Sequence, residues 1–497
     1  MGVPYSLVSH VSPVYWRRIV THVVARIAPG RAHYAQHMPA PVNRAATVRR
    51  SITAAAGSAV ALWLAFAGVH LWLGFLNLYG AGLPMGDVTY VYLFWVERGV
   101  LGNEWVGIDT SWVYPLLALV PMLIAYAFGP DLYGTTWLTI AMMLNAVALV
   151  SIIGVEERAR RAGIAWFWML FLVLVGPIAL GRIDAITVPI ALVAVLLIAD
   201  HPRWAGALLA VGAWIKVWPA GLLLAALIAV RARGRVVVAA VAVSIAVVAT
   251  GIALGGASAL LSPISEQAGR GLQVEAPVST VWLWAAATGE WAARVYYDQG
   301  ILTWQVLGDG STQAAAVMTP LLALAVLVIV VLGFIAVRHG VDEVELLPVL
   351  ALALVMTLIT VNKVGSPQFA TWIAVPVILG LAWQRWGGVS FRMPAVLALF
   401  IAALTQVVYP VLYGSLLALD PSLLIVLSVR NLLYVVLLSW AVRQLISLCW
   451  RSRVELPASP SAPSSPSAPS APSIAASTAI TTAEPVRPSA AQEGASS

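Results

Sequence analysis

Cysteine, lysine and charge are all scarce in this chain of 497 residues. Its one cysteine, Cys449, excludes an intrachain disulfide framework and a cysteine-based metal cluster. Only 10% of the residues are charged, and of the 28 basic residues just two, Lys216 and Lys363, are lysines. The positions of these two lysines are therefore informative.

Sequence motifs for metals and nucleotides are also missing. The seven histidines do not cluster, and no Asp-x-Asp pair stands in a loop. Neither a Rossmann nor a P-loop glycine pattern occurs, which argues against a nucleotide sugar or ATP as a direct ligand. The sequence predicts chemistry that uses neither a metal nor another cofactor.

Hydrophobic residues make up 61% of the chain, and its mean hydropathy is +0.90, above what a soluble core requires. Several apolar runs exceed the roughly 18–20 residues that cross a bilayer, so we predict an all-α polytopic membrane protein. Twelve transmembrane helices are expected, at about 54–77, 111–129, 132–154, 164–182, 183–199, 204–230, 236–255, 314–337, 344–361, 368–384, 391–413 and 422–446.

The arginines decide the expected orientation. They gather in residues 1–50 and in short loops, which the positive-inside rule places in the cytoplasm. Twelve spans then put both termini inside and the helical loops 77–111 and 256–313 outside. We therefore attribute the net charge of +7 to membrane topology and expect no nucleic-acid partner. The same count leaves loop 156–161 outside, against the rule. Either that loop is an exception, or residues 155–230 contain half-spanning helices.

Three regions are expected along the chain. Residues 1–50 form a basic cytoplasmic segment, and residues 51–450 form the transmembrane domain. Residues 451–497 are rich in Ser, Pro and Ala, cannot bury a core, and predict a disordered cytoplasmic tail.

The first outer loop concentrates acidic residues. A carboxylate held just outside the hydrocarbon, beside aromatic side chains, suits a general base that serves a lipid-borne substrate. Asp87 follows Gly86 and precedes an aromatic stretch that includes Tyr92, which makes it the candidate. Asp87 could also simply cap the helix that begins there.

Both lysines stand in or beside apolar segments, where a charge is costly and by default functional. Lys216 and Lys363 would offer cations to a phosphate group. Lys216 could instead snorkel or pair with Asp184, and Arg182 and Asp184 could form a buried ion pair of purely structural use.

Further candidates lie in the second outer loop and just after Lys363. Arg270 could bind phosphate through two hydrogen bonds, while Gln273 and Glu275 could bind sugar hydroxyls. These three residues could also belong to a solvated helix face. Gln368 lies close to Lys363 in sequence and could bind phosphate or sugar.

Four local patterns together resemble glycosyltransferase family 87 of the GT-C superfamily, whose best-known members are actinobacterial α-1,2-mannosyltransferases. The resemblance covers about residues 54–446. Leu116 replaces a proline and Phe369 a tyrosine that members often have. The patterns are Gly86-Asp87 with Tyr114-Pro115; Gly212-Ala-Trp-Ile-Lys216-Val-Trp-Pro219; Arg270-Gly-Leu-Gln-Val-Glu275; and Lys363-Val-Gly-Ser-Pro-Gln-Phe-Ala-Thr-Trp372.

The resemblance implies a GT-C-type fold and an inverting transfer of mannose from polyprenyl-phosphate-mannose to a glycolipid acceptor of the phosphatidylinositol mannoside or lipomannan type. It implies that Asp87 is the catalytic base, in an active site on the outer side of the cell membrane. Alternatives are a secondary transporter or lipid-linked glycan flippase, an arabinofuranosyltransferase and an oligosaccharide ligase. The expected donor-phosphate ligands are Lys363, Arg270 and Lys216, and the expected sugar ligands are Tyr92, Tyr114, Gln273, Glu275 and Gln368.

Overall fold

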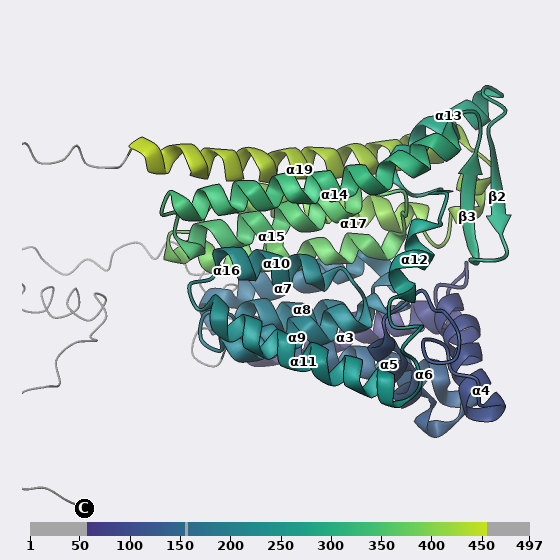
Figure 1. Cartoon of the computed structure of the whole chain (residues 1–497), viewed down its shortest axis with the longest axis horizontal. Helices are drawn as coiled ribbons and strands as arrows, with labels where there is room; N and C mark the ends of the chain where they lie inside the picture. The colour runs from purple at the N-terminus through teal and green to yellow at the C-terminus, as the bar shows by residue number, and fades with distance from the viewer. Residues whose placement is uncertain (1–56, 155–157, 455–497) are drawn as a thin grey trace, which may run out of the picture.

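The computed structural model describes residues 57–154 and 158–454; the expected segment 1–50 and tail residues 455–497 lie outside this range. Helices run side by side along one axis, and a small sheet lies at one end of the bundle (Figure 1). Seven helices in the described part are long and apolar enough to cross a membrane, which makes this a helical polytopic membrane protein. They are α3 (Ala59–Tyr79), α6 (Tyr133–Ile153), α7 (Arg158–Val175), α11 (Arg233–Ala253), α14 (Ser311–Arg338), α15 (Glu343–Thr360) and α19 (Pro421–Val454).

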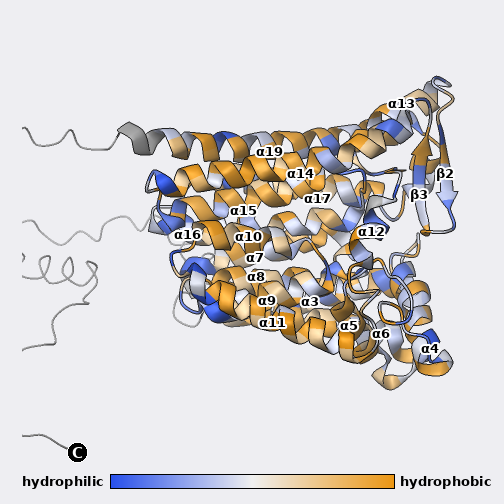
Figure 2. Cartoon of the chain, viewed as in Figure 1, coloured by the Kyte–Doolittle hydropathy of each residue, from blue (hydrophilic) through white to orange (hydrophobic). Residues whose placement is uncertain are grey.

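Shorter helices complete the bundle, and their apolar residues run along it between more polar ends (Figure 2). Helix α15 lies at the centre, where nearly all its side chains are buried. Most helices are apolar all round because they face either this core or lipid. The shorter helices are α8 (Asp184–Leu197), α9 (Pro202–Ile215), α10 (Pro219–Ala229), α16 (Ala374–Trp383) and α17 (Arg392–Val408).

The single span expected over residues 204–230 is wrong. Helix α9 ends at Ile215 and α10 begins at Pro219, so two helices replace one. Proline has no N–H to donate and suits the first turn of a helix, which explains why a new helix starts there. The residues between them, 216–218, include Lys216.

Helices α9 and α10 form a hairpin with Lys216 at its tip. Gly206 in the first half of α9 packs against the backbone of Val236 near the start of α11. After α10 the chain reaches Arg231, which pairs with Asp342 just before α15. Lys216, at the other end of both helices, lies beside the start of α8. The hairpin therefore enters the bundle and returns to the side from which it came.

Residues 111–129 do not make the single crossing that their hydropathy predicts. Leu78 at the end of α3 and Thr89 both lie against Gly134 at the start of α6. Helix α3 therefore ends where α6 begins, and the chain between them returns to the end of the bundle that it left. Within this stretch lie α4 (Leu93–Gly102), α5 (Leu119–Ala125) and a π-helix at Asp87–Tyr92.

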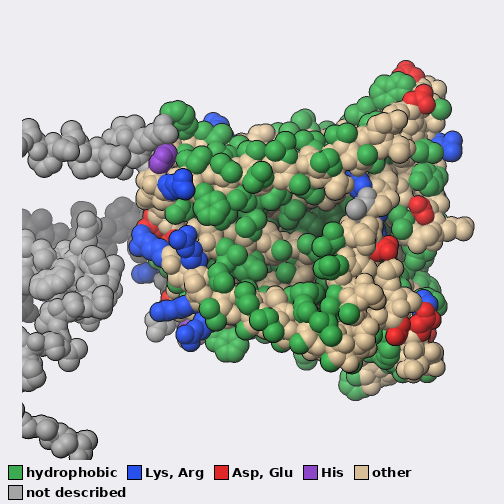
Figure 3. All heavy atoms as spheres, in the orientation of Figure 1, with side chains coloured by type: hydrophobic (Ala, Val, Ile, Leu, Met, Phe, Trp, Pro, Cys, Tyr) green, Lys and Arg blue, Asp and Glu red, His purple; other side chains and the backbone are tan. Residues whose placement is uncertain are grey.

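This correction removes the conflict over loop 156–161, of which the structure describes residues 158–161. Arg160 and Arg161, at the start of α7, line one cavity with Arg385 and Arg392. Gly388, close to Arg385 in sequence, packs against the carbonyl of Val344, beside the Arg231–Asp342 pair. We call this end, with Arg160, Arg231, Arg385 and Arg392, the arginine end. Basic side chains gather there, and acidic side chains gather at the opposite end (Figure 3).

The loop 256–313 was expected to be helical and contains both helices and a small sheet. It includes α12 (Ser262–Ala268) and α13 (Thr280–Thr288), but β1 (Leu272–Gln273), β2 (Arg294–Asp298) and β3 (Thr303–Leu307) pair antiparallel in the order β1-β3-β2. The aromatic and β-branched residues of β2 and β3 favour strands. Leu272 and Val306 bury the sheet against Leu427 of α19.

Candidate active site

The carboxylate of Asp87 lies beside a buried guanidinium. Asp87 is the first residue of the π-helix, and its Oδ2 is 2.9 Å from Nε of Arg182. The Arg182 side chain is 8% exposed, whereas that of Asp87 is 41% exposed. The carboxylate is thus fixed by a charge partner and still open to another molecule.

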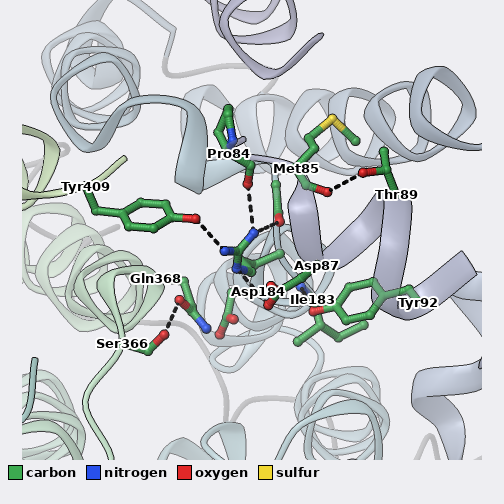
Figure 4. Close-up of polar contacts among 12 residues, drawn as sticks. Pro84, Met85, Asp87, Thr89, Tyr92, Ile183, Asp184, Ser366, Gln368 and Tyr409 are labelled. Carbon is green, nitrogen blue, oxygen red and sulfur yellow. Dashed lines mark hydrogen bonds and ion pairs between the residues drawn. The ribbon is translucent and has the colours of Figure 1, made fainter. Parts of the chain in front are cut away.

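Three further acceptors hold Arg182 in place. Its Nη1 donates to the carbonyls of Pro84 (2.7 Å) and Gly181 (2.8 Å), and its Nη2 donates to the hydroxyl of Tyr409 (2.6 Å). Figure 4 shows Pro84 and Tyr409 on one side of this group and Asp87 and Tyr92 on the other. Segments from α3–α4, α7–α8 and α17 therefore converge on one guanidinium.

A second ion pair begins two residues later. Asp184 is 1% exposed and accepts from Nζ of Lys216 (2.6 Å) and from Nε1 of Trp372 (2.6 Å). The Lys216 ammonium also lies 5.3 Å from the ring centre of Phe369. Lys216 therefore forms the ion pair with Asp184 that the sequence analysis gave as one alternative. Arg182 pairs with Asp87, so a buried Arg182–Asp184 pair is wrong.

The interpretation of Asp87 as a helix cap is not supported. The residue before the π-helix is Gly86, and no side chain caps this helix end. The carboxylate is directed to Arg182 instead. Asp109, in the same loop, is the acid that accepts from a backbone N–H, that of Trp105, at 2.7 Å.

Tyr92 and Tyr114 form part of an aromatic group next to Asp87. Their hydroxyls are 3.3 Å apart, and the Tyr92 hydroxyl also accepts from the backbone N–H of Ile183. Burial, and after it the negative charge of Asp87, raises the pKa of the Tyr114 phenol above its usual range. Tyr92 is 1% exposed and supports the site from within, whereas Tyr114 lines a cavity.

That cavity, of about 360 Å³, brings both lysines of the chain together. Its lining comes from α12, α14, α15, the tip between α9 and α10, and the segments around Tyr114 and Phe369. Lys216 and Lys363 are its basic residues, and most other lining side chains are apolar, among them Ile264 and Leu322. Figure 3 shows the molecule hollowed on this side, next to α12. Two cationic side chains therefore line a cavity that is otherwise mostly apolar.

Arg270 lies near this cavity, at the end of the segment that follows α12. Burial lowers the pKa of its guanidinium, while the nearby phenol of Tyr114 and the carboxylates of Glu266 and Asp298 oppose the shift. Its Nε is buried and makes no hydrogen bond within the described residues. Such a donor is suited to an anion.

Gln273, Glu275 and Gln368 are all buried. Gln273 donates its backbone N–H to the carbonyl of Lys363 and accepts through Oε1 from the N–H of Gly365. Gln273 thus fixes the loop that carries Lys363. Gln368 accepts from the hydroxyl of Ser366 (Figure 4).

Glu275 is enclosed with Arg430 of α19. Its Oε2 is 2.6 Å from Nη1 of Arg430, and the two side chains are 2% and 1% exposed. Burial raises the pKa of the Glu275 carboxyl, and Arg430 opposes the shift. Gln273 and Glu275 are thus held by contacts within the protein, and sugar binding by them stays a prediction.

Sequence reasoning missed Tyr409 and Arg430. Tyr409 ends α17 more than two hundred residues from its partner Arg182, and nothing local marks it. Arg430 carries a signal, because an arginine in the middle of an apolar helix is costly unless it is paired.

Comparison with known proteins agrees with the sequence patterns. The model of glycosyltransferase family 87 matches residues 112–361, half of the chain. This range includes Tyr114, Lys216 and Arg270 and ends just before Lys363. No curated protein and no solved structure matches the chain. The chain belongs to glycosyltransferase family 87.

Proposed function

We propose that this glycosyltransferase moves mannose from polyprenyl-phosphate-mannose to a lipid-linked glycan of the phosphatidylinositol mannoside or lipomannan type, forming an α-1,2 linkage. The observation that carries the proposal is the apolar cavity that holds Lys216 and Lys363. A polyprenyl chain needs an apolar groove, and its phosphate needs cations. A soluble nucleotide-sugar donor would need no such groove.

The donor would lie with its hydrocarbon along Ile264 and Leu322 and its phosphate near the two lysines. Arg270 would add a third cation near the same phosphate. In a site that excludes water, such contacts stabilise the charge that develops on the leaving phosphate more strongly than they would in solution. Tyr114 lies between this cavity and Asp87 and would contact the sugar.

The reaction would be a single displacement. An acceptor hydroxyl oxygen attacks the anomeric carbon while the bond from that carbon to the phosphate oxygen breaks. The hydroxyl proton passes to the Asp87 carboxylate, and the polyprenyl phosphate leaves with the bonding electron pair. Because the donor is β-linked and the product α-linked, one displacement inverts the anomeric centre. Arg182 would hold the Asp87 carboxylate in place for the acceptor hydroxyl.

The active site would face the outside of the cell membrane, since the arginine end would face the cytoplasm. An Asn103→Cys variant in a Cys449→Ser background tests this orientation, because Asn103 lies in the first outer loop. A membrane-impermeant maleimide should label it in intact cells. Labelling only after lysis would place Asp87 on the cytoplasmic side.

The decisive experiment for the activity uses the purified full chain, radiolabelled polyprenyl-phosphate-mannose and a membrane lipid extract. Label should appear in a new glycolipid, and linkage analysis should give an α-1,2 bond. Transfer from a polyprenyl-phosphate arabinofuranose donor instead would identify an arabinofuranosyltransferase. Transfer of a whole oligosaccharide would identify an oligosaccharide ligase. Sugar uptake into proteoliposomes without any transfer would support the transporter alternative.

A further inference from the structure

A second cavity, of about 320 Å³, lies at the arginine end, opposite Asp87. It is lined by the start of α7, the end of α16 with the turn that follows it, and the start of α17. The lining combines basic and apolar side chains. The basic ones are Arg160, Arg161, Arg385 and Arg392, and the apolar ones include Ile164 and Leu381.

An apolar track continues from this cavity along two packed helices. Helices α7 and α17 contact each other along the bundle. On α7, Leu170 lies seven residues after Gly163 of the cavity and thus on the same face; it is 47% exposed. On α17, Val396 and Phe400 follow Arg392 at four-residue spacing and are also exposed. Exposed apolar side chains therefore follow the arginines along α7 and α17, toward the middle of the bundle.

The cavity also lies at the expected level of lipid head groups. The exposed Trp386 follows α16, and the guanidinium of Arg385 lies 4.8 Å from its ring centre. Tryptophan is enriched where membrane and water meet, and cationic side chains there reach toward phosphates.

We propose that this cavity binds the phosphate group of an anionic phospholipid. Arg160 and Arg392 would donate to the phosphate oxygens through their planar guanidinium groups, and the acyl chains would lie along Leu170, Val396 and Phe400. Basic pockets between transmembrane helices suit such head groups. An inorganic phosphate would use the arginines alone, and the apolar track would have no role.

The test measures lipid binding to the purified full chain by native mass spectrometry in detergent. The probes are phosphatidylglycerol, phosphatidylcholine and inorganic phosphate. Phosphatidylglycerol should bind at low micromolar concentration and should survive mild activation, and phosphatidylcholine should not. The variant Arg160→Gln/Arg392→Gln should weaken phosphatidylglycerol binding roughly thirtyfold, since each basic residue near a membrane surface contributes about 1 kcal/mol.

The control variant is Arg233→Gln/Arg235→Gln, which removes the same charge from exposed residues at the start of α11. It should bind phosphatidylglycerol as the unaltered chain does. An equal loss in this control would show that the whole arginine end attracts anions and would overturn the proposal. Equal binding of phosphatidylcholine, or full competition by millimolar inorganic phosphate, would also overturn it.

A variant that fails to fold would not end the test. Arg160→Lys/Arg392→Lys keeps both charges and removes only the forked donors, so it should fold and still lose affinity, by roughly three- to tenfold. Unchanged affinity in this variant, together with unchanged affinity in a Phe400→Asn variant that interrupts the apolar track, would contradict a built lipid site.

Discussion

Two carboxylate–arginine pairs in this protein have similar geometry and opposite surroundings. Asp87 and Arg182 are 2.9 Å apart, and Glu275 and Arg430 are 2.6 Å apart. The Asp87 side chain is 41% exposed, whereas the Glu275 side chain is 2% exposed. An open carboxylate is placed to accept a proton from a substrate, while an enclosed one is held by its partner. Exposure therefore distinguishes the two pairs where distance does not.

The strongest test of this comparison is Asp87→Asn. The amide can still accept a hydrogen bond from Arg182 but cannot take up the acceptor proton, so the transfer rate should fall by roughly 10²–10⁴. Rates are measured at saturating donor with radiolabelled substrate. Asp109→Asn, in the same loop, serves as control and should keep most activity. Near-normal turnover of Asp87→Asn would show that Asp87 is not the general base.

The enclosed pair should respond through stability instead. Glu275→Gln leaves the charge of Arg430 buried without a counter-charge, which should lower the free energy of unfolding by about 3–5 kcal/mol. Unfolding in denaturant measures this change. The double variant Glu275→Gln/Arg430→Gln should recover most of the loss. A stable Glu275→Gln protein that has lost its activity would mean that Glu275 acts on substrate, and the comparison would fail.

A smaller effect is expected from the lysines of the cavity. Lys363→Met should raise the KM for the donor roughly 10–100-fold, the range for a lost hydrogen bond to a charged group, with kcat less affected. Lys216→Met would also leave Asp184 unpaired, so it should lose stability as well. Lys216→Met/Asp184→Asn separates the two effects. An unchanged KM in both lysine variants would show that the donor phosphate does not bind in this cavity.

The smallest effect is expected from deleting residues 456–497. These residues are rich in Ser, Pro and Ala, so neither packing nor catalysis should depend on them. Transfer activity per unit of membrane-inserted protein should stay within about twofold, an effect of less than 0.5 kcal/mol. A large loss in a normally inserted protein would assign the tail a role in the reaction.

Hydropathy was sufficient to predict a helical membrane protein, and most expected spans coincide with helices. It could not show that residues 111–129 turn back, because that depends on where α6 begins relative to α3. The break at Pro219 was visible in the sequence, but the apolar run across it suggested one span. The strands of loop 256–313 were missed because its tryptophans suggested interfacial helices.

The candidate site was predictable to a similar extent. Scarcity of lysine indicated Lys216 and Lys363, and both line the cavity. The partner of Asp87 could not be foreseen, since Arg182 lies ninety-five residues away and the nearby Asp184 was the more obvious partner. Pairing between distant helices is set by packing, which a single sequence does not contain.

The α9–α10 hairpin also constrains the order in which the protein assembles. With 14 and 11 residues, the two helices are about 21 and 16 Å long, shorter than the roughly 30 Å of bilayer hydrocarbon. Neither can insert as an independent span, and the exposed backbone at the tip must be shielded by protein. During biogenesis the hairpin would therefore reach its final position only after α15 and the Trp372 segment have been synthesised. Until then the Lys216–Asp184 pair would lack the hydrogen bond that Trp372 donates to Asp184.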